Sequence, residues 1–226
     1  MAQRKAFFGQ SQKILHRRRK NREKCFFCKK RKHVANLVIF ASGSGTNAER
    51  IITYFAPRKD IAVRLVLSNR ADAYVLQRAA RLNVPCEVFG RADLYDSPRI
   101  MQRLQELETD WIILAGFLWK VPDAIVQAYA GRIINIHPAL LPAYGGRGMY
   151  GHHVHQAVID HHEKESDITV HYVDDQYDHG RIIMQARCPV FETDTPDTLA
   201  ARIHQLEYAY FPVAIAQAID SESAGK

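Results

Sequence analysis

The chain has 226 residues and is 47% hydrophobic, which suits one domain with a full core, or one domain plus a tail. No apolar run approaches the 18 residues of a membrane helix, and four scattered cysteines favour a reducing, cytoplasmic compartment over a disulfide framework. The formal net charge of +7 does not indicate a nucleic-acid-binding fold, because the basic residues gather at one end.

Residues 1–34 carry the excess positive charge. They hold 13 of the 31 Lys and Arg but only one acid, Glu23, which leaves 18 bases against 23 acids elsewhere. They lack the apolar core of a secretory signal. Three interpretations stay open: a disordered basic arm that touches nucleic acid or anionic surfaces, a targeting segment, or an extension with no role in the fold, which we favour. The C-x-x-C at Cys25 and Cys28 has only His33 nearby, too few ligands for structural zinc.

A strand, a glycine loop and a helix begin at Asn36. Residues 37–41 form a short apolar run typical of a buried strand, and G-S-G-T-N at residues 43–47 precedes a predicted helix. Backbone N–H groups at such a helix start suit a phosphate. The loop is not a Walker A motif but fits G-x-G-x-x-A, a loose dinucleotide fingerprint. Together with Arg70 after the next strand, this fingerprint leaves an NADP-binding oxidoreductase open as an alternative. A second alternative is that the glycine loop is only a structural turn.

Strands and helices alternate from there to Gly131. We expect strands at residues 63–67, 84–89 and 111–116, and helices at residues 73–82, 99–107 and 125–129. This spacing predicts an α/β fold with a doubly wound, mostly parallel sheet. Residues 117–121 leave the fourth strand as an apolar segment, which either walls a flat heterocycle or packs in the core.

Residues 132–142, R-I-I-N-I-H-P-A-L-L-P, are the most informative stretch. The β-branched run predicts a buried strand, on which Asn135 and His137 face the same side. Pro138 ends the pairing, and open α/β sheets bind ligands at the carboxyl ends of their strands. Acyl transfer needs such a pair, an amide to stabilise an oxyanion and a base to move a proton. The competing interpretation is that both side chains only satisfy backbone groups at the strand end.

A glycine-rich loop and three histidines follow this strand. The loop at residues 143–151 includes four glycines within seven residues, which predicts a mobile lid beside the site. His152, His153 and His155 lack H-E-x-x-H spacing. We therefore assign them to a helix start or loop packing rather than to a metal site.

An antiparallel strand pair and a long helix complete the chain. The alternating run at residues 168–173, the acidic loop at 174–180 and the return at 181–185 predict the pair. The last helix is expected to start at Thr195-Pro196-Asp197 and run to about residue 220, bent or broken at Pro212.

Four motifs in this order resemble the phosphoribosylglycinamide formyltransferase family. They are S-G-S-G-T-N, A-G-F-L, I-N-I-H-P-A-L-L-P and V-H-Y-V-D-D-Q-Y-D-H-G, and the match covers residues 36–219. The family transfers a formyl group from 10-formyltetrahydrofolate to the amine of glycinamide ribonucleotide in purine biosynthesis. The resemblance thus implies a Rossmann-like formyltransferase domain at residues 35–226, formyl-folate as cosubstrate and no metal.

The resemblance also implies roles for matching residues. The catalytic set comprises Asn135, His137 and Asp178. The ribonucleotide is held by Gly45, Thr46, Asn47 and Glu207. The folate pocket is walled by Leu118, Trp119, Lys120, Val121, Asp174 and Asp175. His171 matches a strand histidine beside the site whose role is open.

The chemistry of these residues and the family resemblance together predict a mechanism, and two related activities are alternatives. The uncharged amine attacks the formyl carbon, Asn135 and a His137 imidazolium donate to the oxyanion, and Asp178 raises the pKa of His137. Formyl-folate hydrolysis and another formyl transfer, such as that to methionyl-tRNA, are the nearest alternatives. We expect small-molecule substrates, no membrane, nucleic acid only through the basic extension, and a monomer or homodimer.

Overall fold

The structure, a computed structural model, describes residues 33–224. The predictions made for the basic extension, including its disorder and its C-x-x-C motif, therefore lie outside the described residues. Within the described part, no helix is both long and apolar enough to cross a bilayer.

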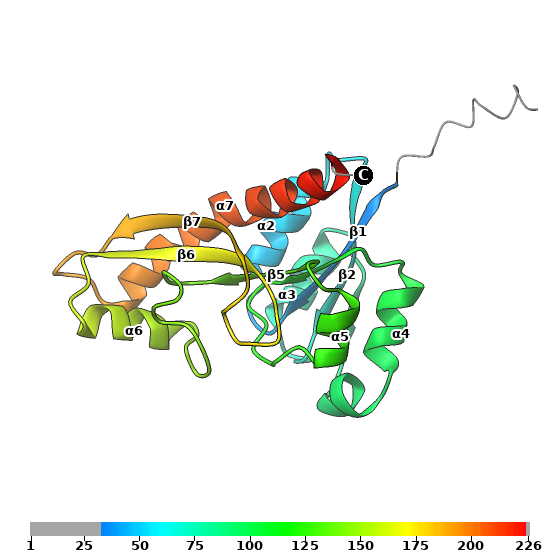
Figure 1. Cartoon of the computed structure of the whole chain (residues 1–226), viewed down its shortest axis with the longest axis horizontal. Helices are drawn as coiled ribbons and strands as arrows, with labels where there is room; N and C mark the ends of the chain where they lie inside the picture. Colours follow the sequence, from blue (N-terminus) through cyan, green and yellow to red (C-terminus); the bar gives the residue numbers. More distant parts are fainter. Residues whose placement is uncertain (1–32, 225–226) are drawn as a thin grey trace, which may run out of the picture. The chain divides into compact units, whose positions relative to one another are not determined.

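A seven-stranded sheet lies at the centre of the domain, in the order β3-β2-β1-β4-β5-β6-β7 (Figure 1). The strands are β1 (Ala35–Ala41), β2 (Ile61–Ser68), β3 (Cys86–Val88), β4 (Trp111–Leu114), β5 (Ile133–His137), β6 (Glu165–Tyr172) and β7 (Ile182–Pro189). β1 to β5 are parallel, whereas β6 is antiparallel to both β5 and β7. The predicted doubly wound sheet with an antiparallel C-terminal pair is confirmed.

Helices cover both faces of this sheet. They are α2 (Thr46–Phe55), α3 (Tyr74–Arg81), α4 (Arg99–Glu106), α5 (Asp123–Ala128), α6 (His152–Asp160) and α7 (Pro196–Ala224), with a π-helical turn η1 (Ala92–Asp96). One core cluster joins the sheet to α2, α3, α6 and α7, and a second joins it to η1, α4 and α5. In Figure 1, α4 and α5 accordingly lie on the other side of β1 from α7.

β1 shows why the run at its centre is apolar throughout. Leu37 and Ile39 belong to the first core cluster, and Val38 and Phe40 to the second. Alternate side chains of a strand point to opposite faces, so a strand covered on both faces is apolar at every position. This two-sided burial holds the carboxyl end of β1, and the glycine loop that follows, in a fixed place.

Several element boundaries differ from the predictions, and β3 and α7 are two examples. β3 spans only Cys86–Val88, because Pro85 has no N–H to extend the ladder. α7 continues through Pro212 without a break, although a bend or a break was expected there. Phe211 and Ile215 on either side are fully buried against the sheet, and this packing outweighs the loss of one helical hydrogen bond. Thr195 accepts the N–H of Thr198 and caps the helix as predicted.

Candidate active site

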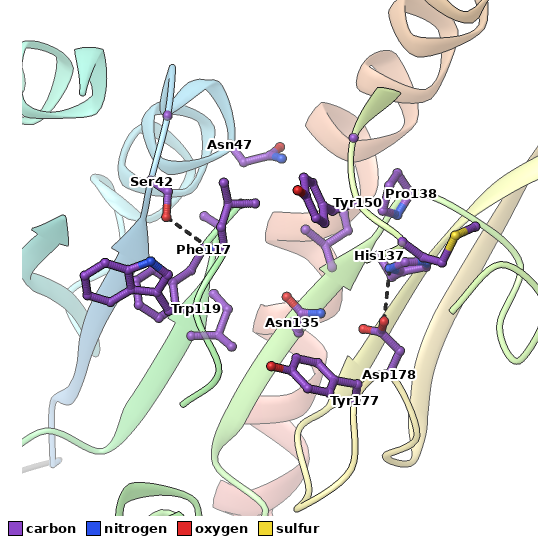
Figure 2. A pocket seen from close by; sticks show the side chains of 18 of the residues that line it. Ser42, Asn47, Phe117, Trp119, Asn135, His137, Pro138, Tyr150, Tyr177 and Asp178 are labelled. Carbon is purple, nitrogen blue, oxygen red and sulfur yellow. Dashed lines mark hydrogen bonds and ion pairs between the residues drawn. The ribbon is translucent and has the colours of Figure 1, made fainter. Parts of the chain in front are cut away.

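A cavity of about 740 Å³ opens at the carboxyl ends of β1, β4 and β5 (Figure 2). Loops after these strands form its floor, and the glycine-rich loop, the β6–β7 loop, α6 and α7 complete its walls. This is the edge where a doubly wound sheet binds ligands. Of the predicted site residues, the cavity lining includes Gly45, Thr46, Asn47, Leu118, Trp119, Lys120, Val121, Asn135, His137, Asp174, Asp178 and Glu207.

Asn135 and His137 reach this cavity from the same face of β5, as their spacing predicts. The His137 ring is buried, and its Nε2 lies 2.7 Å from the carbonyl oxygen of Tyr144. A carbonyl oxygen only accepts hydrogen bonds, so Nε2 carries the proton. In the neutral ring, the lone pair is therefore on Nδ1.

Asp178 is brought to His137 by a tight turn after β6. A Cβ at Gly180 would lie 1.8 Å from the Tyr172 carbonyl oxygen, so only glycine fits there. Asp178 itself has a φ of 52°. Its Oδ2 accepts the N–H of Gly146 at 2.9 Å and lies 3.6 Å from His137 Nδ1. At that separation there is no direct hydrogen bond, and the carboxylate attracts the ring only once Nδ1 is protonated.

Burial and neighbouring charges act in opposite directions on the pKa values of His137 and Asp178. Burial lowers the pKa of His137 below its ordinary value, and this outweighs the opposing effects of Asp178 and the Tyr144 carbonyl. Asp178 thus acts in the predicted direction, and burial favours the neutral ring in the resting site, a charge state that the sequence left open. Burial also acts to raise the pKa of Asp178, yet His171, His137 and the Gly146 N–H together lower it. Near pH 7, the site holds a carboxylate beside a neutral imidazole.

The glycine loop and α7 form a second part of the cavity wall. Gly45 has a φ of 75°, and a Cβ there would lie 2.4 Å from the side chain of Val75, so glycine is required. α2 begins at the next residue, and its first residues, whose N–H groups have no partner within the helix, line the cavity. Asn47 Nδ2 donates to Glu207 Oε2 at 2.9 Å. Burial raises the pKa of Glu207, although the hydrogen bond from Asn47 opposes this effect.

An aromatic wall lies across the cavity from His137, where Figure 2 shows Phe117 and Trp119. Their ring centroids are 6.4 Å apart, and the guanidinium of Arg91 lies 5.4 Å from the Trp119 ring. The Leu118 N–H donates to Ser42 Oγ at 3.0 Å, which ties this wall to the end of β1. A flat, partly apolar ligand fits such a wall.

Asp175 does not share in this cavity. The Gln176 N–H donates to Asp174 Oδ1 at 2.9 Å, and this turn leaves Asp175 exposed and outside the cavity lining. The assignment of Asp175 to the folate wall is therefore not supported by the geometry.

Some lining residues were not predicted as site residues. His155 lies in the first turn of α6, as expected for a helix start, but its ring is buried at the cavity. Its Nδ1 has no hydrogen-bond partner among residues 33–224, and burial lowers its pKa to about 4. Tyr150, Tyr177 and His204 also line the cavity. The cluster of His152, His153 and His155 after a glycine loop was the sequence signal for this wall.

The residues that the structure describes include no group of three or more His, Cys, Asp or Glu side chains arranged to hold a metal ion.

Comparison with known proteins identifies the family. The family described as "Formyl transferase" matches residues 35–215. The chain is 36% identical over 186 residues to phosphoribosylglycinamide formyltransferase of Escherichia coli (strain K12), a match covering 80% of this chain and 85% of that protein. It is 35% identical over 193 residues to the Bacillus subtilis (strain 168) protein of the same name, covering 83% and 96%. The crystal structure of phosphoribosylglycinamide formyltransferase from Anaplasma phagocytophilum matches with a TM-score of 0.75 and 32% identity, covering 83% and 88%. The chain therefore belongs to the formyl transferase family.

Proposed function

We propose that this chain is a phosphoribosylglycinamide formyltransferase that moves a formyl group from 10-formyltetrahydrofolate to the amine of 5′-phosphoribosylglycinamide. The observation that carries the proposal is a single cavity joining three features: Asn135 and His137 with Asp178, a glycine loop at a helix start, and an aromatic wall. The relatives of the same name, which match most of this chain, support this function in purine biosynthesis.

In the proposed mechanism, Asn135, His137 and Asp178 form the catalytic set. The uncharged amine attacks the formyl carbon, and an Asn135 N–H stabilises the oxyanion. Neutral His137 accepts the proton of the attacking nitrogen at Nδ1, and Asp178 stabilises the resulting imidazolium. The bond from the formyl carbon to the folate nitrogen then breaks, and that nitrogen takes the proton from the imidazolium. A neutral resting His137 is the form that this order of steps requires.

The two substrates would occupy the two halves of the cavity. The N–H groups at Gly45, Thr46 and Asn47 suit the ribonucleotide phosphate, because they lie at the start of α2. The Glu207 carboxyl, which lines the cavity beside Asn47, would accept from a hydroxyl or amine of the same substrate. The folate ring would lie against the wall formed by Leu118, Trp119, Lys120, Val121 and Asp174.

We further propose that residues 35–226 contain the whole catalytic apparatus and that residues 1–34 are dispensable for it. All the residues assigned above lie beyond residue 34. A contact of the extension with nucleic acid, and a monomeric or homodimeric state, stay predictions.

A folate absorbance assay tests the function directly. The full chain is mixed with 10-formyl-5,8-dideazafolate, with and without glycinamide ribonucleotide. Deformylation only in the presence of the ribonucleotide is the expected result. Deformylation without it would identify a hydrolase, and inactivity at saturating concentrations of both substrates would overturn the proposal.

A further inference from the structure

His171 contacts the amide that the proposed mechanism uses as its oxyanion donor. It stands on β6 directly opposite Asn135 on β5. Asn135 Nδ2 lies 3.1 Å from His171 Nε2, and the histidine side chain is only 2% exposed. The histidine end of this contact is therefore buried, while the amide lines the cavity.

The tautomer of His171 follows from its other neighbour. His171 Nδ1 lies 2.8 Å from the carbonyl oxygen of Tyr172, which can only accept. Nδ1 therefore carries the proton, and Nε2 of the neutral ring presents a lone pair. Only a donor can pair with that lone pair, so the Asn135 nitrogen, not its oxygen, faces the ring.

This pairing selects one of the two orientations of the amide. A flipped Asn135 would place its oxygen against the lone pair of His171 Nε2, which is repulsive. In the selected orientation, one N–H is bound by the histidine and the second remains for a ligand in the cavity. The amide plane is thus fixed before any substrate arrives, as transition-state stabilisation requires.

The surroundings of His171 contain one competing partner. Asp178 Oδ1 lies 3.7 Å from Nε2, beyond hydrogen-bond distance. A proton on Nε2 would turn that nitrogen toward the carboxylate and remove the acceptor that Asn135 needs. His137 and Asp174 are the other titratable groups whose charge acts within this cluster. The neutral ring is the form that holds the amide.

We infer that His171 is a positioning residue for formyl transfer: its neutral imidazole orients the Asn135 amide so that an N–H faces the developing oxyanion. This inference rests on the proposed function for its catalytic consequence. The hydrogen bond between His171 and Asn135 does not depend on the proposed function, so the hydrogen bond and the function can be refuted separately.

Kinetics of paired variants test the catalytic consequence. His171→Phe keeps an aromatic ring, slightly larger than imidazole, without an acceptor, whereas the side-chain oxygen of His171→Gln can replace Nε2. We expect His171→Phe to lower kcat roughly 10- to 100-fold with KM within threefold, since a disordered donor retains part of its effect. His171→Gln should recover most of that loss. In an Asn135→Ala background, His171→Phe should cost less than threefold, because its target is already absent. Independent, multiplicative losses, or an unchanged kcat in His171→Phe, would overturn the inference.

Nitrogen-15 NMR of the wild-type chain tests the hydrogen bond without turnover, and a variant serves only to assign signals. We expect His171 to show a protonated Nδ1 and an unprotonated Nε2 at pH 7.5. One Asn135 side-chain proton, assigned by its loss in Asn135→Ala, should be shifted downfield. A protonated Nε2, or Asn135 side-chain protons with no downfield shift, would refute the positioning role. If the NMR result is as expected but the folate assay is silent, the proposed function fails and the hydrogen bond stands.

Discussion

Three features of its surroundings determine the tautomer and the charge of His137. The Tyr144 carbonyl holds the proton on Nε2, burial keeps the ring neutral, and Asp178 lies beside Nδ1 at 3.6 Å. A base with this arrangement accepts a proton on the side facing its carboxylate partner. The same carboxylate then stabilises the charge that results.

Truncation of either strand side chain should reduce turnover while leaving the fold intact. Asn135→Ala removes the oxyanion donor and should lower kcat roughly 10²–10³-fold. His137→Ala removes the proton acceptor and should lower kcat roughly 10²–10⁴-fold. The folate assay measures both, with thermal melting as the check on folding. A variant that keeps more than a third of wild-type turnover would remove that residue from the mechanism.

The pH dependence of kcat should report the interaction of Asp178 with His137. Burial lowers the pKa of His137, so the active neutral form persists below the ordinary value of 6.5 and is lost on further acidification. The Asp178 charge opposes burial and raises that pKa. Asp178→Asn should therefore move the acid limb to lower pH, in addition to lowering the maximal rate. A limb that moves to higher pH would contradict the assignment of His137 as the base.

The start of α2 depends on one glycine rather than on a side-chain cap. Gly45 occupies the N-cap position with φ near 75°, and no side-chain hydrogen bond caps the helix among the described residues. Val75 of α3 packs where a Cβ would stand, so the loop, α2 and α3 meet at a single backbone position. Helix packing and the proposed phosphate contact are consequently set by the same residue.

Substitution of this glycine should disturb both stability and ribonucleotide binding. Gly45→Ala adds left-handed strain and a clash with Val75, which should lower the free energy of unfolding by roughly 1–3 kcal/mol. It should also raise KM for the ribonucleotide. Gly43→Ala is the matched control for stability, because its added Cβ meets no atom within 4 Å. Denaturant unfolding compares the two, and equal losses would show that the left-handed position is unimportant.

The sequence predicted the parts of the site that depend on one strand or one loop. Asn135 and His137 share a face because the strand period is two, and β5 has the boundaries that Pro138 implies. Contacts between elements could not be derived from periodicity or spacing, and only the family resemblance grouped Asp178 with Asn135 and His137. The pairing of Asn135 with His171 follows from the β5–β6 register. The position of Asp178 depends on the turn after β6, in which Gly180 packs against the Tyr172 carbonyl. The lowered pKa of His137 likewise required its burial to be known.

Two buried groups outside the catalytic set give the domain opposite responses to pH. Asp167 is fully buried, its carboxyl oxygens have no hydrogen-bond partner within residues 33–224, and burial raises its pKa from 3.8 to about 7. Burial lowers the pKa of His155 from 6.5 to about 4. Between about pH 4 and 6.5, the folded chain holds a proton on Asp167 and none on His155, and the unfolded chain does the reverse. Their contributions to the slope of stability against pH therefore cancel.

Single substitutions should reveal how Asp167 and His155 each contribute to the dependence of the free energy of unfolding on pH. The Asp167 contribution is present at low pH and is lost as pH rises from about 4 to about 7, so Asp167→Asn should gain stability relative to wild type over that range. The His155 contribution is present above pH 6.5 and is lost as pH falls to about 4, so His155→Gln should gain relative stability toward acid. The difference in free energy of unfolding between each variant and wild type should change by up to about 1.4 kcal/mol per pH unit, the value for uptake or release of one proton. Urea unfolding from pH 4 to 8 measures both, with the exposed Asp175→Asn as the control for loss of a carboxylate. Slopes of the same sign in the two variants would show that these groups do not exchange protons on unfolding as their burial requires.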